Sequence, residues 1–67
     1  MTNTEKLREI IDNSGYKFEH IAAEIGMTRF GLYKKLQEGS EFKPSQILKL
    51  CELLHIEENQ RAEIFLI

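Results

Sequence analysis

The chain has one cysteine, one proline and no tryptophan among its 67 residues. The single cysteine, Cys51, cannot form an internal disulfide, so the fold must rely on a packed core, and a reducing compartment suits it. The longest purely apolar run is the segment from Ile64 to Ile67, whereas a membrane-spanning helix needs about 20 such residues. We therefore expect a cytoplasmic protein without a membrane segment or signal peptide.

The composition is 42% apolar and 30% charged, which is typical of a globular protein and predicts a single domain over residues 1–67. A chain of this length buries only about 60% of the surface that it exposes when unfolded. We expect little stability in reserve, so each buried side chain contributes a large share of it.

The net charge of −2 does not by itself indicate a nucleic-acid partner. Its distribution is more informative, because residues 27–49 hold five basic residues against two acids, whereas the rest of the chain holds four against nine. A local excess of +3 is enough for contact with phosphate but predicts weak non-specific binding.

Helical spacing of apolar residues, without sustained strand alternation, predicts an all-α fold of five helices. Thr2 and Glu5 have the spacing of a capping box, and Gly15 is placed to end the first helix. Pro44 favours the first turn of the fourth helix. We expect Leu48 and Leu53 to widen the buried stripe of that helix and Phe42 to fill the core between the third and fourth helices. The five expected helices are 2–14, 18–25, 28–37, 44–54 and 57–65.

The functional prediction depends mainly on the segment 18–37. Ile21 and Ile25 give a short helix one apolar stripe, and Gly26 is suited to end it. Thr28 is a good N-cap for the next helix, whose buried stripe is Leu32 and Leu36. Two helices joined by a short turn containing glycine predict a helix-turn-helix.

The second helix of this pair has an outward face of unusual composition. At 100° per residue, its exposed side carries aromatic, cationic and amide side chains. Cations can meet phosphate or guanine, and an apolar ring can meet a thymine methyl group. An ordinary solvated face remains the alternative. The candidate base-reading residues are Arg29, Phe30, Tyr33, Lys34 and Gln37.

The stretch Ile-Ala-Ala-Glu-Ile-Gly-Met-Thr at 21–28, followed by Leu32 and Leu36, resembles the helix-turn-helix of the phage repressor and Cro family. The five-helix count extends the resemblance over nearly the whole chain. It implies a five-helix, lambda-repressor-like domain that binds a double-stranded DNA operator, with the recognition helix 28–37 in the major groove. No cofactor or small-molecule ligand is implied.

The resemblance also implies roles for residues beside the base-reading face. Thr28 would cap the recognition helix and touch phosphate. Family members commonly pair through their C-terminal helices, which implies a homodimer with a contact formed by Ile64, Phe65, Leu66 and Ile67. Packing of this tail on the first helix of the same chain is the alternative. The residues expected to approach the DNA backbone are Lys17, Phe18, Thr28, Lys35, Lys43 and Ser45.

Two departures from the family pattern leave an alternative open. Phe18 stands where the family often has a glutamine that binds phosphate, and the loop from Gln37 to Phe42 is longer than usual. The exposed aromatics Phe30 and Tyr33 would also suit a protein-interaction module, such as an antirepressor or antitoxin-like partner.

Cys51 and His55, four residues apart, could supply half of a zinc site or a thiol–imidazole pair. No second ligand pair stands at a suitable distance, so a core cysteine and a histidine at a helix end are the simpler interpretation. We expect no enzymatic activity, because the sequence contains no phosphate loop, catalytic triad or paired-carboxylate motif.

Overall fold

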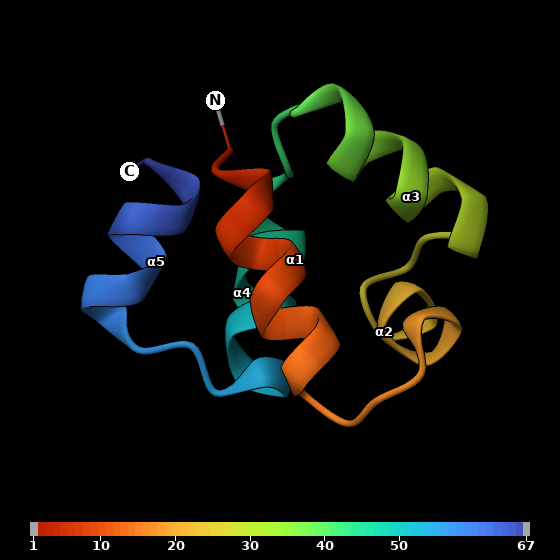
Figure 1. The fold of residues 1–67 in the computed structure, drawn as a ribbon, viewed down its shortest axis with the longest axis horizontal. Helices are drawn as coiled ribbons and strands as arrows, with labels where there is room; N and C mark the ends of the chain where they lie inside the picture. The colour runs from red at the N-terminus through yellow and green to blue at the C-terminus, as the bar shows by residue number, and fades with distance from the viewer. Residues whose placement is uncertain (1, 67) are drawn as a thin grey trace.

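The structure is a computed structural model that describes residues 2–66 of the chain. These residues form five helices and no strand, as the sequence predicts. Figure 1 shows α1 in the middle of the molecule, with α5 on one side and α2 and α3 on the other. The helices are α1 (Thr4–Asn13), α2 (Phe18–Glu24), α3 (Arg29–Glu38), α4 (Pro44–Leu54) and α5 (Glu58–Phe65).

Each helix contributes at least one fully buried side chain to a single core. Because every helix turns one apolar stripe inward, the five stripes meet in one cluster. This arrangement fixes α3 against both α1 and α2 while leaving the other side of α3 exposed. Fully buried residues, one from each helix in order, include Leu7, Ile21, Leu32, Leu50 and Ile64.

The fourth helix has the predicted bounds, but its buried stripe is narrower than expected. Leu50 is its only buried side chain among the described residues, and Cys51 is half-buried. Leu53 packs against the core, as predicted, but Leu48 is 54% exposed, so the prediction that Leu48 widens the stripe is wrong. Leu48 lies two positions from Leu50, about 160° away around the helix, and therefore faces solvent.

The first helix begins at Thr4 with Asn3 as its N-cap, so the predicted capping box at Thr2 is wrong. The Asn3 side-chain oxygen accepts a hydrogen bond from the Lys6 backbone N–H at 3.2 Å. Thr2 is instead buried, and its hydroxyl donates to the Ser40 carbonyl oxygen at 3.4 Å. The Asn3 backbone N–H donates to the Ile64 carbonyl oxygen at 2.6 Å, which ties the start of the chain to α5.

Replacing Asn3 with alanine is expected to lower the free energy of unfolding by about 1 kcal/mol, because the first turn of α1 loses its cap. The main-chain bond from Asn3 to Ile64 survives this change. Urea denaturation followed by circular dichroism measures the difference. Asn13→Ala, at the exposed end of the same helix, is the matched control. Equal stability of Asn3→Ala and the parent would contradict the cap.

The loop between α3 and α4 is anchored by Phe42, as predicted. The Phe42 ring is buried and meets the Phe65 ring edge-on, with centroids 6.0 Å apart. The Lys35 ammonium lies 5.4 Å from the centroid of the Phe42 ring and donates to the Glu41 carbonyl oxygen at 2.8 Å. Both ends of this short loop are therefore held against helices.

The C-terminal helix packs inward through two of the four residues expected at a dimer contact. Ile64 and Phe65 are buried against α1 and the α3–α4 loop within the same chain. Leu66 is 61% exposed. Ile67, the last residue of that prediction, lies outside the described residues. In the described part of the chain, no helix has the length and apolar character needed to cross a bilayer.

Candidate nucleic-acid interface

The turn between α2 and α3 is fixed by main-chain hydrogen bonds. The Met27 N–H donates to the Ala22 carbonyl oxygen at 2.8 Å, and the Gly26 N–H donates to the Ala23 carbonyl oxygen at 3.0 Å. This pair of bonds is a Schellman motif, which needs a left-handed residue at Gly26, and its φ is +76°. Glycine adopts that conformation at little cost. The turn therefore sets a defined angle between the two helices.

Thr28 caps α3, as predicted. Its hydroxyl oxygen accepts a hydrogen bond from the Gly31 N–H at 3.0 Å. A Cβ atom added at Gly31 would lie 3.0 Å from the same oxygen. The absence of a side chain at Gly31 therefore lets the Thr28 hydroxyl approach the first turn of α3 and cap it. The Thr28 hydroxyl thus accepts the hydrogen bond that caps the helix, and the Thr28 residue is exposed at the start of α3.

Opposite faces of α3 have opposite character. Leu32 and Leu36 are buried on one side, and Phe30 is 72% exposed on the other. Phe30 shares its exposure with Lys34 and Gln37. We call this surface, together with Arg29 and Tyr33, the reading face.

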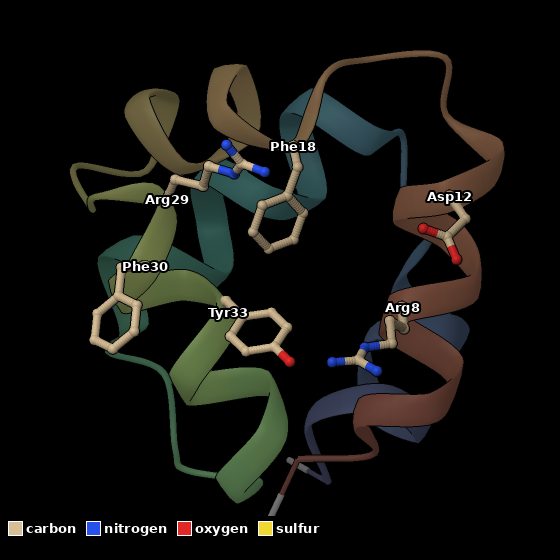
Figure 2. Close-up of a pocket in the computed structure, with 6 residues that line it drawn as sticks. All are labelled: Arg8, Asp12, Phe18, Arg29, Phe30 and Tyr33. Carbon is tan, nitrogen blue, oxygen red and sulfur yellow. The ribbon is translucent and has the colours of Figure 1, made fainter.

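The structure divides the reading face into two parts. Arg29 and Tyr33 line a pocket of about 660 Å³ between α3 and α1, with Phe30 at its edge. Figure 2 shows the Tyr33 ring and Phe18 directed toward the middle of this pocket, whereas Phe30 points away from it. Lys34 and Gln37 do not line the pocket and project outward from α3. We call this cavity the α1–α3 pocket.

Two pocket residues come from α1 and were missed by the sequence analysis. Arg8 places its guanidinium carbon 5.9 Å from the centroid of the Tyr33 ring, which is a cation–π contact. Asp12 lies one turn further along α1. Their i, i+4 spacing beside the buried stripe of Leu7 and Ile11 was visible in the sequence. The contact with α3 was not, because it depends on how the two helices pack.

The predicted backbone-contacting residues fall into two groups. Lys17 and Phe18 lie at the start of α2, and only Lys17 is fully exposed. Lys43 and Ser45 are exposed at the start of α4. The Lys43 N–H donates to the Gln46 side-chain oxygen at 2.8 Å, which leaves the Lys43 ammonium to project from the surface.

Lys35 differs from the other predicted backbone contacts. Its ammonium is turned toward Glu41 and Phe42 and holds the α3–α4 loop. A structural role within the chain therefore accounts for Lys35 without any contact to DNA.

Cys51 and His55 do not form a reactive pair. Burial raises the pKa of the Cys51 thiol above its ordinary value, and the nearby charge of Arg61 opposes this shift only in part. The thiol therefore stays protonated near neutral pH. The thiolate form, which acts as a nucleophile or a metal ligand, is disfavoured. His55 has left the helix and adopts a left-handed conformation with φ +55°. Within residues 2–66, no cluster of three metal-ligand side chains occurs.

No protein-family model, curated protein or solved structure matches this chain. The interpretation of the reading face therefore depends on its own residues and geometry.

Proposed function

We propose that this protein is a cytoplasmic, sequence-specific regulator that binds double-stranded DNA, of the phage repressor and Cro type that its sequence resembles. In this proposal α2 and α3 form the helix-turn-helix of a lambda-repressor-like domain. The observation that carries the proposal is the exposed side of α3. On this side the side chains of Phe30, Lys34 and Gln37 are exposed to solvent, whereas Leu32 and Leu36 are buried on the opposite side.

The dimensions of α3 support this proposal. A helix of ten residues is about 15 Å long, and its diameter with side chains is about 10–12 Å. The major groove of B-form DNA is about 12 Å wide, so it admits such a helix. The first turn of α3 contains Arg29 and no acid, so nothing at the leading end would repel phosphate.

The chemistry of the exposed side chains supports base reading. Lys34 and Arg29 can donate to guanine, and Gln37 can form paired hydrogen bonds with adenine. The Phe30 ring suits contact with a thymine methyl group. Lys17 and Lys43, at the starts of α2 and α4, would contact the sugar-phosphate backbone on either side and fix the register of α3.

Selection from a pool of random duplexes by the purified protein tests the proposal. We expect a shared motif to be enriched. We also expect the logarithm of the binding constant to fall with the logarithm of the salt concentration, with a slope of about −2 for each protein chain, because Lys17 and Lys43 would each neutralise one phosphate. A two-fold repeat in the motif would report a dimer on DNA and give its half-site spacing.

Absence of an enriched motif from a folded protein, together with salt-independent duplex binding, would contradict the proposal. That result would favour the protein-interaction module on the same fold. Helical circular dichroism with a cooperative melting transition serves as the folding control for this selection.

Replacing Lys43 with alanine is expected to weaken binding to all duplex sequences alike and to reduce the salt slope by about 1. The reason is that its exposed ammonium would contact phosphate, while its backbone N–H keeps the bond to Gln46. Titration of the selected duplex and a scrambled duplex across a salt series measures both effects. Lys6→Ala, which removes a lysine paired with Glu63 away from α3, is the control. A change in sequence preference would contradict a backbone role for Lys43.

A further inference from the structure

The α1–α3 pocket has a composition that DNA reading does not require. Two aromatic rings, those of Phe18 and Tyr33, and two guanidinium groups line it, together with one carboxylate and with Phe30 at its edge. Its volume of about 660 Å³ lies within the range of about 300–1,000 Å³ that is usual for ligand sites. The lining residues are Arg8, Asp12, Phe18, Arg29, Phe30 and Tyr33.

The charges in the pocket favour an acidic occupant. Arg8 comes from α1 and Arg29 from α3, and neither guanidinium group forms an ion pair or a hydrogen bond with any residue in the range 2–66, although that of Arg8 contacts the Tyr33 ring. Figure 2 shows the Arg8 guanidinium directed across the pocket toward Tyr33 rather than toward Asp12. Guanidinium groups bind carboxylates through two parallel hydrogen bonds. Two guanidinium groups without an ion-pair partner, beside one carboxylate, therefore give the pocket an excess of positive charge that a second carboxylate can neutralise.

The aromatic side chains favour an occupant that is also apolar. Phe18 is half-buried and packs against the core, and Tyr33 is 48% exposed above the pocket. Covering these rings with another apolar side chain would remove exposed aromatic surface from water. Aromatic and arginine residues are also the types that dominate the energetics of protein–protein interfaces.

We propose that the α1–α3 pocket binds a segment of a partner protein in which a carboxylate stands beside a large apolar side chain. The bound segment excludes DNA, because Arg29, Phe30 and Tyr33 belong both to the pocket and to the reading face. The exclusion of DNA depends on the proposed function, whereas the binding of the peptide segment does not. The pocket would then be the site through which a partner controls DNA binding.

A single-stranded nucleic acid is the other occupant with suitable chemistry, since bases stack on aromatic rings and phosphates meet guanidinium groups. Asp12 argues against it. Every nucleotide of a single strand adds a negatively charged phosphate. The proposed peptide segment instead carries one carboxylate for the guanidinium groups, and its backbone N–H groups can donate hydrogen bonds to Asp12. The acid in the pocket thus favours a peptide.

Selection of peptides from a displayed library of random dodecapeptides by the whole protein tests this inference. We expect enriched peptides to share an acidic residue next to an aromatic or large aliphatic residue. Fluorescence anisotropy of a labelled enriched peptide then gives its affinity. Arg8→Gln is expected to weaken binding about tenfold, as the loss of one charge-assisted interaction implies. Lys49→Gln, which removes one exposed charge from α4, is expected to leave it unchanged.

Arg8 lies on α1, outside the reading face, and is exposed, so Arg8→Gln should keep the parent melting temperature. Enrichment of no peptide, or of peptides without acids, would overturn the inference. So would equal affinity of the peptide for Arg8→Gln and the parent. Binding of a labelled dodecathymidylate that Arg8→Gln weakens, without a selected peptide, would assign the pocket to single-stranded nucleic acid instead.

Competition separates this inference from the proposed function. The selected peptide is expected to release the selected duplex from the parent, but about tenfold less effectively from Arg8→Gln. Peptide and duplex bound together would overturn the mutual exclusion and leave DNA binding intact. A protein that binds the peptide and no duplex would overturn the proposed function and leave the peptide site standing.

Discussion

Replacing Phe65 with alanine is expected to lower the free energy of unfolding by about 3–5 kcal/mol, the usual cost of deleting a buried aromatic ring. A domain of this size has a total stability of roughly 3–10 kcal/mol. The variant should therefore be largely unfolded at moderate temperature. The physical reason is that the Phe65 ring is buried and packs edge-on against Phe42. Thermal and urea denaturation followed by circular dichroism measure the loss.

The neighbouring residue provides a matched control. Leu66 is 61% exposed, so Leu66→Ala should change stability by no more than about 0.5 kcal/mol. This pair of variants distinguishes a core role from a dimer contact. If Phe65 formed a dimer contact instead, the loss of stability on its replacement would depend on protein concentration. A loss of stability in Phe65→Ala that varied with protein concentration would contradict the assignment of Phe65 to the core.

Replacing Arg29 or Lys34 with alanine is expected to cost about 1–3 kcal/mol in binding to the selected duplex and to relax the preference at one base position. Both side chains are exposed on α3, so neither change should disturb the fold. Anisotropy titrations against the selected duplex and its single-base variants measure the effect. Binding to a scrambled duplex should fall much less than binding to the selected one.

Lys49→Ala is the control for charge, because Lys49 is exposed on α4 away from the reading face. It should retain the base preferences of the parent. Arg29 also lines the α1–α3 pocket, so Arg29→Ala should weaken peptide binding as well, whereas Lys34→Ala should not. If both variants kept full affinity and base preference, the assignment of the reading face would be wrong.

Local chemistry in the sequence was sufficient to predict most of the helices. Pro44 marks the start of α4 because its ring suits the first turn, and Thr28 caps α3 through a bond to a residue three positions away. Gly26 ends α2 through its left-handed conformation. Each of these signals acts within a few residues, so the sequence displays it directly.

Features that depend on packing between distant segments were not predictable in this way. Thr2 has the correct spacing for a cap, yet contact with Ser40 draws it inward and leaves Asn3 as the cap. Ile64 and Phe65 formed an apolar tail in the sequence, and only their position beside α1 and the α3–α4 loop shows that they are core residues. The sequence analysis missed the contribution of Arg8 to the pocket for the same reason.

The position of Phe42 has a consequence for the energetics of any ligand at the start of α4. Its ring lies between the Lys35 ammonium and the Phe65 ring, so the loop that presents Lys43 is immobilised before a ligand arrives. A pre-organised loop loses little conformational entropy on binding. Helix α5 would therefore raise the affinity for such a ligand by restricting the motion of the loop rather than by any contact of its own.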